Sequence, residues 1–95
     1  MIRDEVKQFV GLGPLPDSSA DEVAIQTYED ALATITAPVS NEEARALLGC
    51  FGSDDCFGLA WTLLHLLETA PNHPLDAKPP GGANPWLTTL WERAH

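Results

Sequence analysis

Eight prolines decide where helices can begin and end in this 95-residue chain. Proline lacks a backbone N–H and clashes with the preceding turn, so a helix cannot continue through it. Pro14 and Pro16 therefore close a first segment, Pro38 closes a second and Pro71 closes a third. Residues 71–83 contain four prolines and two glycines, which predicts a loop. The chain is thus divided into short helical segments, within a length typical of one domain.

The strongest of these segments runs from Asp55 to about Thr69. Its apolar residues cover most of a helix circumference, which is typical of a buried central helix. Ser53 or Asp54 is expected to cap it, and Asp54 and Asp55 lie where the helix dipole favours negative charge. Its predicted core residues are Phe57, Leu59, Ala60, Trp61, Leu63, Leu64, Leu66 and Leu67.

Shorter helices are predicted on both sides of this segment. Residues 2–10 are expected to form a helix that residues 11–16 terminate, and no stretch shows sustained strand-type alternation. We therefore predict one all-α domain over residues 1–95, a compact bundle of four or five short helices around the 55–69 helix. The start signals of the flanking helices are two capping boxes and an Asn-Pro pair: Ser19 with Glu22, Ser40 with Glu43, and Asn84 followed by Pro85.

The chain is strongly acidic. The formal net charge is -9, and every charged residue between Gln8 and Ala44 is acidic. Binding to nucleic acid or to an anionic membrane needs clustered lysines and arginines, so both are disfavoured. A basic protein partner is favoured, although solubility alone is an alternative explanation. The candidate contact residues in the acidic segments are Asp21, Glu22, Glu29, Asp30, Asp54 and Asp55.

One polar stripe interrupts the apolar 55–69 segment and contains His65 and Glu68, which are close enough on a helix to pair. A metal site in a helical bundle needs several such units, and this chain has a single His-x-x-Glu. We therefore expect a hydrogen-bonded histidine inside the core or at its edge, and keep both residues as candidate partner contacts. Cys50 and Cys56 form neither a C-x-x-C motif nor a zinc set, so free thiols are expected.

Catalytic and targeting signals are not found in the sequence. There is no phosphate-binding glycine loop, nucleophile elbow or metal quartet, so we expect neither enzyme activity nor a cofactor. No apolar stretch is long enough to cross a membrane, and the first residues lack a signal-peptide core. A cytoplasmic protein is therefore expected.

The runs 41–48 and 51–71 together resemble the small all-helical immunity proteins of bacterial polymorphic-toxin systems. The resemblance rests on the Asp54-Asp55 pair, on the Leu-x-His-x-x-Glu end of the apolar helix, and on the closing Trp86–Trp91 segment. The loop at 71–83 is longer than in that pattern. The resemblance implies a protein that binds and blocks a cognate toxin, and the acidic charge agrees with it.

Two other functions stay open. A helical scaffold or regulatory domain would differ only in its partner. An acyl carrier domain is also short, acidic and helical, but it carries its cofactor on the serine of an Asp-Ser-Leu motif. Here Asp17-Ser18 lacks the leucine and comes too early in the chain.

Overall fold

The computed structural model describes residues 2–17, 19–52, 56–75 and 77–94. Over these residues the fold is all-α, as predicted, with no strand. The elements in chain order are α1 (Asp4–Gly11), α2 (Glu22–Ala33), α3 (Asn41–Leu47), η1 (Leu48–Cys50), η2 (Cys56–Gly58), α4 (Leu59–Leu67) and α5 (Pro85–Ala94), where η denotes a 3-10 helix.

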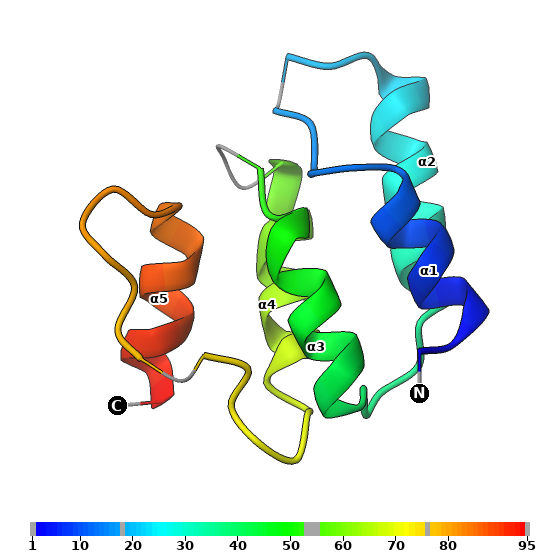
Figure 1. Cartoon of the computed structure of the whole chain (residues 1–95). Coiled ribbons are helices and arrows are strands. Elements are labelled where there is room, and N and C mark those ends of the chain that lie inside the picture. The colour runs from blue at the N-terminus through cyan, green and yellow to red at the C-terminus, as the bar shows by residue number, and fades with distance from the viewer. Residues whose placement is uncertain (1, 18, 53–55, 76, 95) are drawn as a thin grey trace.

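The helices form a thin, two-layered bundle. α1 packs against α2 and α3, and α4 packs against α3 and α5. Figure 1 shows α1 and α3 in front of α2 and α4, with α5 at one edge. The molecule measures 36 × 30 × 17 Å, and the shortest dimension accommodates two layers of helices at about 8–10 Å between axes. Every helix therefore has one side against the core and another at the surface.

The core is apolar and draws on all five α-helices. Of the residues predicted on the 55–69 segment, five are buried: Leu59, Ala60, Leu63, Leu64 and Leu67. The largest completely buried side chains elsewhere are Val6, Phe9, Val39, Leu47, Cys56 and Leu90.

Trp61 was expected in this core, and that prediction is wrong. Its side chain is 41% exposed, and Leu66 is only partly buried. α4 packs against α3 and α5 through its buried residues and leaves Trp61, Thr62 and His65 exposed, although the Trp61 ring still contacts Trp86 of α5. The helix is apolar around much of its circumference, but only part of that circumference is covered.

The central helix also begins later than the sequence predicts. A 3-10 turn occupies Cys56–Gly58, and the α-helix starts at Leu59. Gly58 has φ of +90°, a left-handed conformation that interrupts a right-handed helix and that glycine adopts readily. The expected caps at residues 53–55 lie outside the described residues. The helix ends at Leu67, two residues before the expected Thr69.

Two of the three start signals are confirmed. Ser40 and Glu43 form the expected capping box, with the Ser40 Oγ accepting from the Glu43 N–H at 3.1 Å. The Asn84 Oδ1 accepts from the Trp86 N–H at 2.9 Å, as an N-cap does. The Ser19 prediction is wrong, because Asp21 caps α2 by accepting from the Ala24 N–H at 2.8 Å.

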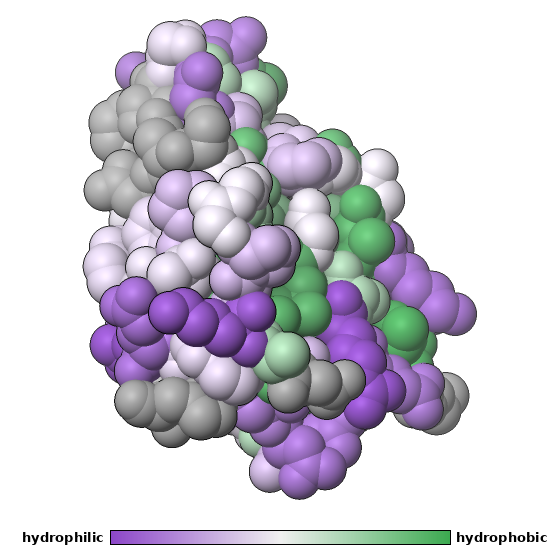
Figure 2. All heavy atoms as spheres, turned by 60° about the vertical axis from the view of Figure 1, so that its left-hand side comes forward, coloured by the Kyte–Doolittle hydropathy of each residue, from purple (hydrophilic) through white to green (hydrophobic). Residues whose placement is uncertain are grey.

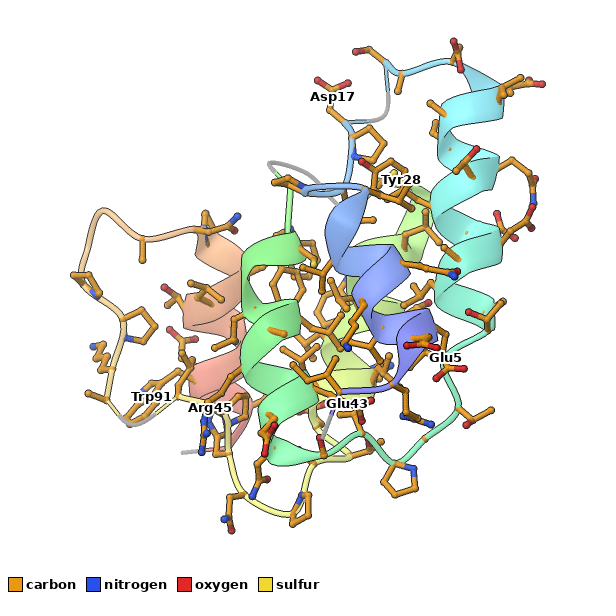
Figure 3. The ribbon with its side chains drawn as sticks, turned by 45° about the vertical axis from the view of Figure 1, so that its right-hand side comes forward. Glu5, Asp17, Tyr28, Glu43, Arg45 and Trp91 are labelled. Carbon is orange, nitrogen blue, oxygen red and sulfur yellow. The ribbon has the colours of Figure 1, made fainter. Side chains whose placement is uncertain are left out.

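Glu43 also anchors a contact between distant parts of the chain. Its carboxylate is 3% exposed and accepts hydrogen bonds from the Arg3 N–H at 3.0 Å and the Arg3 Nε at 2.9 Å. The other carboxylate oxygen accepts from the Ser40 N–H at 2.8 Å. The Arg3 guanidinium in turn donates to the Thr36 Oγ1 and carbonyl, both at 3.0 Å. This Arg3–Glu43 pair joins the start of α1 to the loop between α2 and α3; Figure 3 labels Glu43 at the foot of α3.

A second junction forms where the chain leaves η1. The Leu15 N–H donates to the Cys50 carbonyl at 2.8 Å, and the Asn84 Nδ2 donates to the Gly52 carbonyl at 2.9 Å. Gly52 has no room for a side chain, because a Cβ there would lie 2.1 Å from the Leu15 carbonyl oxygen. Segments from the first, middle and last thirds of the chain therefore meet at this turn.

The proline- and glycine-rich segment 71–83 is a loop, as predicted, and it is attached at its start. The Asn72 N–H donates to the Asn41 Oδ1 at 3.0 Å. The His73 Nδ1 accepts from the Leu75 N–H at 3.1 Å, while its Nε2 lies 3.2 Å from the Leu90 carbonyl oxygen. Both ring nitrogens of His73 therefore lie within hydrogen-bond distance of the backbone. Figure 3 shows Trp91 of α5 toward the same loop, where its ring meets that of His73 edge to face.

The Arg3–Glu43 pair predicts a loss of stability in acid. The Arg3 hydrogen bonds, with those from the backbone, lower the pKa of Glu43 from 4.5 to about 2, against the opposing effect of desolvation. Because the folded-state pKa lies below the usual value, this stabilisation is present above about pH 4.5 and is lost as the pH falls toward 2. We expect Glu43→Gln to lower the free energy of unfolding at neutral pH by about 1–3 kcal/mol.

Urea denaturation of wild type and Glu43→Gln at several pH values measures this effect. The difference between the two proteins should shrink as the pH falls toward 2. Glu29→Gln is the matched control, since Glu29 is exposed on α2, and its difference from wild type should stay near zero. A Glu43→Gln difference that is independent of pH would contradict the assignment.

The Gly52 junction gives a second stability prediction. Gly52→Ala should cost about 1–3 kcal/mol or more, because the new Cβ meets backbone atoms of Leu15 that cannot rotate away. Gly49→Ala is the control, since a Cβ at Gly49 meets nothing within 4 Å. Thermal and urea unfolding of both variants compare the two costs, and equal values would show that Leu15 is not held against Gly52.

Candidate protein-binding surface

The acidic residues predicted to contact a partner lie at the surface of α2. Asp21, Glu22, Glu29 and Asp30 are all exposed. Helical spacing places Glu22, Glu29 and Asp30 on neighbouring turns of one side, around Gln26. We call Asp21, Glu22, Glu29 and Asp30 the acidic face. Asp54 and Asp55, the other two acidic candidates, lie outside the described residues.

The members of the acidic face differ in how their carboxylates are used. Asp21 accepts from the Ala24 N–H as the helix cap, and Asp30 accepts from the Gln26 Nε2 at 2.8 Å. Among the described residues, neither Glu22 nor Glu29 has a hydrogen-bond or ion-pair partner. Those two carboxylates are therefore the ones whose charge is available to a ligand.

A groove lies beside the acidic face, between α2 and α4. It consists of two adjoining hollows of about 520 and 220 Å³, which share Leu32 and Thr62. Glu29 lines the first hollow, next to Gly58 at the start of α4, and His65 lines the second. The second hollow is mainly apolar, with Ile35, Ala37 and Leu66 beside Thr69, whereas the first, completed by Ala33 and Leu59, is lined by polar and apolar groups in similar measure.

His65 and Glu68 do not form the pair that the sequence suggested. Glu68 makes a bidentate ion pair with Arg93 of α5, with Nε–Oε2 at 2.9 Å and Nη2–Oε1 at 3.2 Å. His65 is exposed rather than in the core, and its ring lies 6.2 Å from that of Trp61. A guanidinium matches both carboxylate oxygens at once, which an imidazole cannot do. Glu68 thus ties α4 to α5, while His65 belongs to the groove.

Trp61 is the outer member of a row of aromatic rings. It meets Trp86 edge to face at 5.0 Å between centroids, and Trp86 stacks on Phe51 at 6.1 Å. Partial exposure combined with fixed ring contacts is typical of aromatic residues at protein interfaces. From the sequence, any one of the three tryptophans could be such a partly exposed contact residue; of these, Trp61 is the exposed one.

Large apolar side chains are scarce on the described surface outside the groove. Those that are exposed are Leu12, Val23 and Trp61. On the face drawn in Figure 2, apolar residues reach the surface in separate patches among hydrophilic ones.

The cysteines are free and buried, as expected. Burial raises the pKa of the Cys50 thiol to about 11, which keeps it protonated at neutral pH. Among the described residues, no group of three His, Cys, Asp or Glu side chains is placed to hold a metal ion. Nor does any helix built from those residues have the length and apolar character to span a bilayer.

Comparison of the chain with known protein families, with curated proteins and with solved structures finds no match.

Proposed function

We propose that this chain is a non-enzymatic protein-binding domain that recognises a basic protein, and that this partner is a bacterial toxin domain which it neutralises in the cytoplasm. The observation that carries the proposal is the acidic face of α2, where Glu22 and Glu29 are exposed and lack a partner among the described residues. No lysine or arginine occurs between Gln8 and Ala44 to offset it.

Surface charge of one sign steers an oppositely charged protein and raises its association rate. The same charge repels phosphate groups, so a nucleic acid is not the proposed ligand. A non-enzymatic role also agrees with the state of Cys50. Its thiol is buried and protonated, which makes it a poor nucleophile. The toxin as partner is supported by the motif resemblance at Asp54-Asp55, at 63–68 and at 86–91.

The first experiment identifies the partner. The tagged chain is used to capture proteins from its native cells, and these are identified by mass spectrometry. We expect a basic protein. Recovery of an acidic partner would contradict the charge argument and leave solubility as the role of the acidic residues.

The second experiment tests the acidic face with the captured partner. Glu29→Lys with Asp30→Lys should lower the association rate about tenfold at low salt without unfolding the domain. The wild-type rate should fall as salt rises, because screening shortens the range of the charge to about 8 Å at physiological ionic strength. Stopped-flow or surface plasmon resonance measures both rates, and circular dichroism checks the fold.

Glu92→Lys is the matched control for a single Glu29→Lys variant, since both glutamates are exposed on helices and both changes alter the net charge equally. Equal rates for the two variants would show that only net charge matters, not the acidic face.

Coexpression in a bacterial host then separates the partner classes. Neutralisation requires that the captured protein arrests growth and that this chain restores it; a harmless partner would indicate a scaffold or regulatory domain.

A further inference from the structure

The groove between α2 and α4 has the dimensions of a helix-binding site. Its lining follows α4 from Leu59 to Leu66, which is about 10 Å of helix or two turns, and extends to Gly58 and Thr69 just beyond the helix ends. The other wall is lined by α2 from Glu29 to Ala33 and by Ile35 and Ala37 in the segment that follows it. Grooves of this kind bind amphipathic helices, whose apolar residues recur at i, i+3, i+4 and i+7.

The polar groups at the groove specify the charge of such a helix. Glu29 lines one hollow, and among the described residues no lysine or arginine lines either of them. Arg3 forms its close ion pair with Glu43, and Arg93 forms its own with Glu68, so neither arginine neutralises Glu29. A cationic side chain beside the groove would therefore meet an unopposed carboxylate.

A second copy of this chain does not fit these requirements. Each copy has a net charge of -9, and its α2 presents the same acidic face. Pairing two such surfaces would place like charges together, which costs binding energy. The charge of the groove instead matches a helix that carries lysine or arginine.

We propose that the groove receives an amphipathic helix of the partner, with its apolar side chains in the two hollows and a lysine or arginine against Glu29. This inference rests on the proposed function and assigns the contact that holds the complex once charge has brought it together. Trp61 adjoins Thr62 of the groove and is already fixed against Trp86, so ordering it on binding costs little entropy.

A defined peptide tests the groove with the full chain. The probe is a synthetic helical peptide with leucines at i, i+3, i+4 and i+7 and lysines on its other face. One comparison peptide has the same composition in scrambled order, and another has glutamates in place of the lysines. Titration into the 15N-labelled protein should shift the amide signals of Leu32, Gly58, Thr62 and His65 with the first peptide only.

Thr62→Arg is the decisive variant and Thr27→Arg its matched control. Both threonines are exposed, both donate to the carbonyl four residues earlier, and both changes add one positive charge. Thr62 is shared by the two hollows, whereas Thr27 lies outside the groove. Thr62→Arg should weaken peptide binding about tenfold or more, as loss of a central contact does. Thr27→Arg should weaken it at most about threefold, as a peripheral charge does.

The outcomes separate this inference from the proposed function. If the scrambled peptide binds as tightly as the amphipathic one, or if both arginine variants weaken binding equally, charge alone acts and the groove assignment is wrong. Tight binding of the glutamate peptide, or no binding of the lysine peptide, overturns it as well. In each case the association rates of the Glu29→Lys/Asp30→Lys variant with the captured partner still decide the proposed function.

Discussion

The ion pair of Arg3 and Glu43 is the polar contact on which the arrangement of the helices depends. Glu43 is buried, and its charge is compatible with that position because Arg3 and the Ser40 N–H together satisfy both carboxylate oxygens. The same guanidinium holds the carbonyl of Thr36, so the connection into α3 is fixed at its start. α1 and α2 form one pair of helices and α3 and α4 another; this contact sets one pair against the other.

The thinness of the bundle connects its packing to its proposed role. In a molecule only 17 Å deep, no helix is surrounded on all sides, and α4 leaves the side with Trp61 and His65 uncovered. α2 and α4 both line the groove that lies between them. The residues proposed to bind a partner are then found on the same helices that supply the core. α2 also holds α1 in place through Tyr28 (Figure 3): the Tyr28 ring packs on Phe9, and its hydroxyl donates to the Leu12 carbonyl at 2.6 Å.

Local signals in the sequence were sufficient to predict much of this fold. The Ser40–Glu43 box and the Asn84 cap depend on residues a few positions apart, and proline positions limit the helices directly. Contacts between distant residues could not be predicted in the same way. Arg93 outcompetes His65 for Glu68 across 25 positions, and Arg3 reaches Glu43 across 40. The exposure of Trp61 depends on which helices cover α4, and the late start of α4 depends on the left-handed conformation of Gly58; neither follows from apolar periodicity.

The turn at Gly52 has a consequence for how the molecule unfolds. Its neighbours come from the segment after α1 and from the cap of α5, so neither end of the chain can detach without removing hydrogen bonds from the middle. A protein held together in this way has no half that is complete by itself. Its equilibrium unfolding should be a single cooperative transition, and proteolytic fragments ending near this turn should regain structure only when they are recombined.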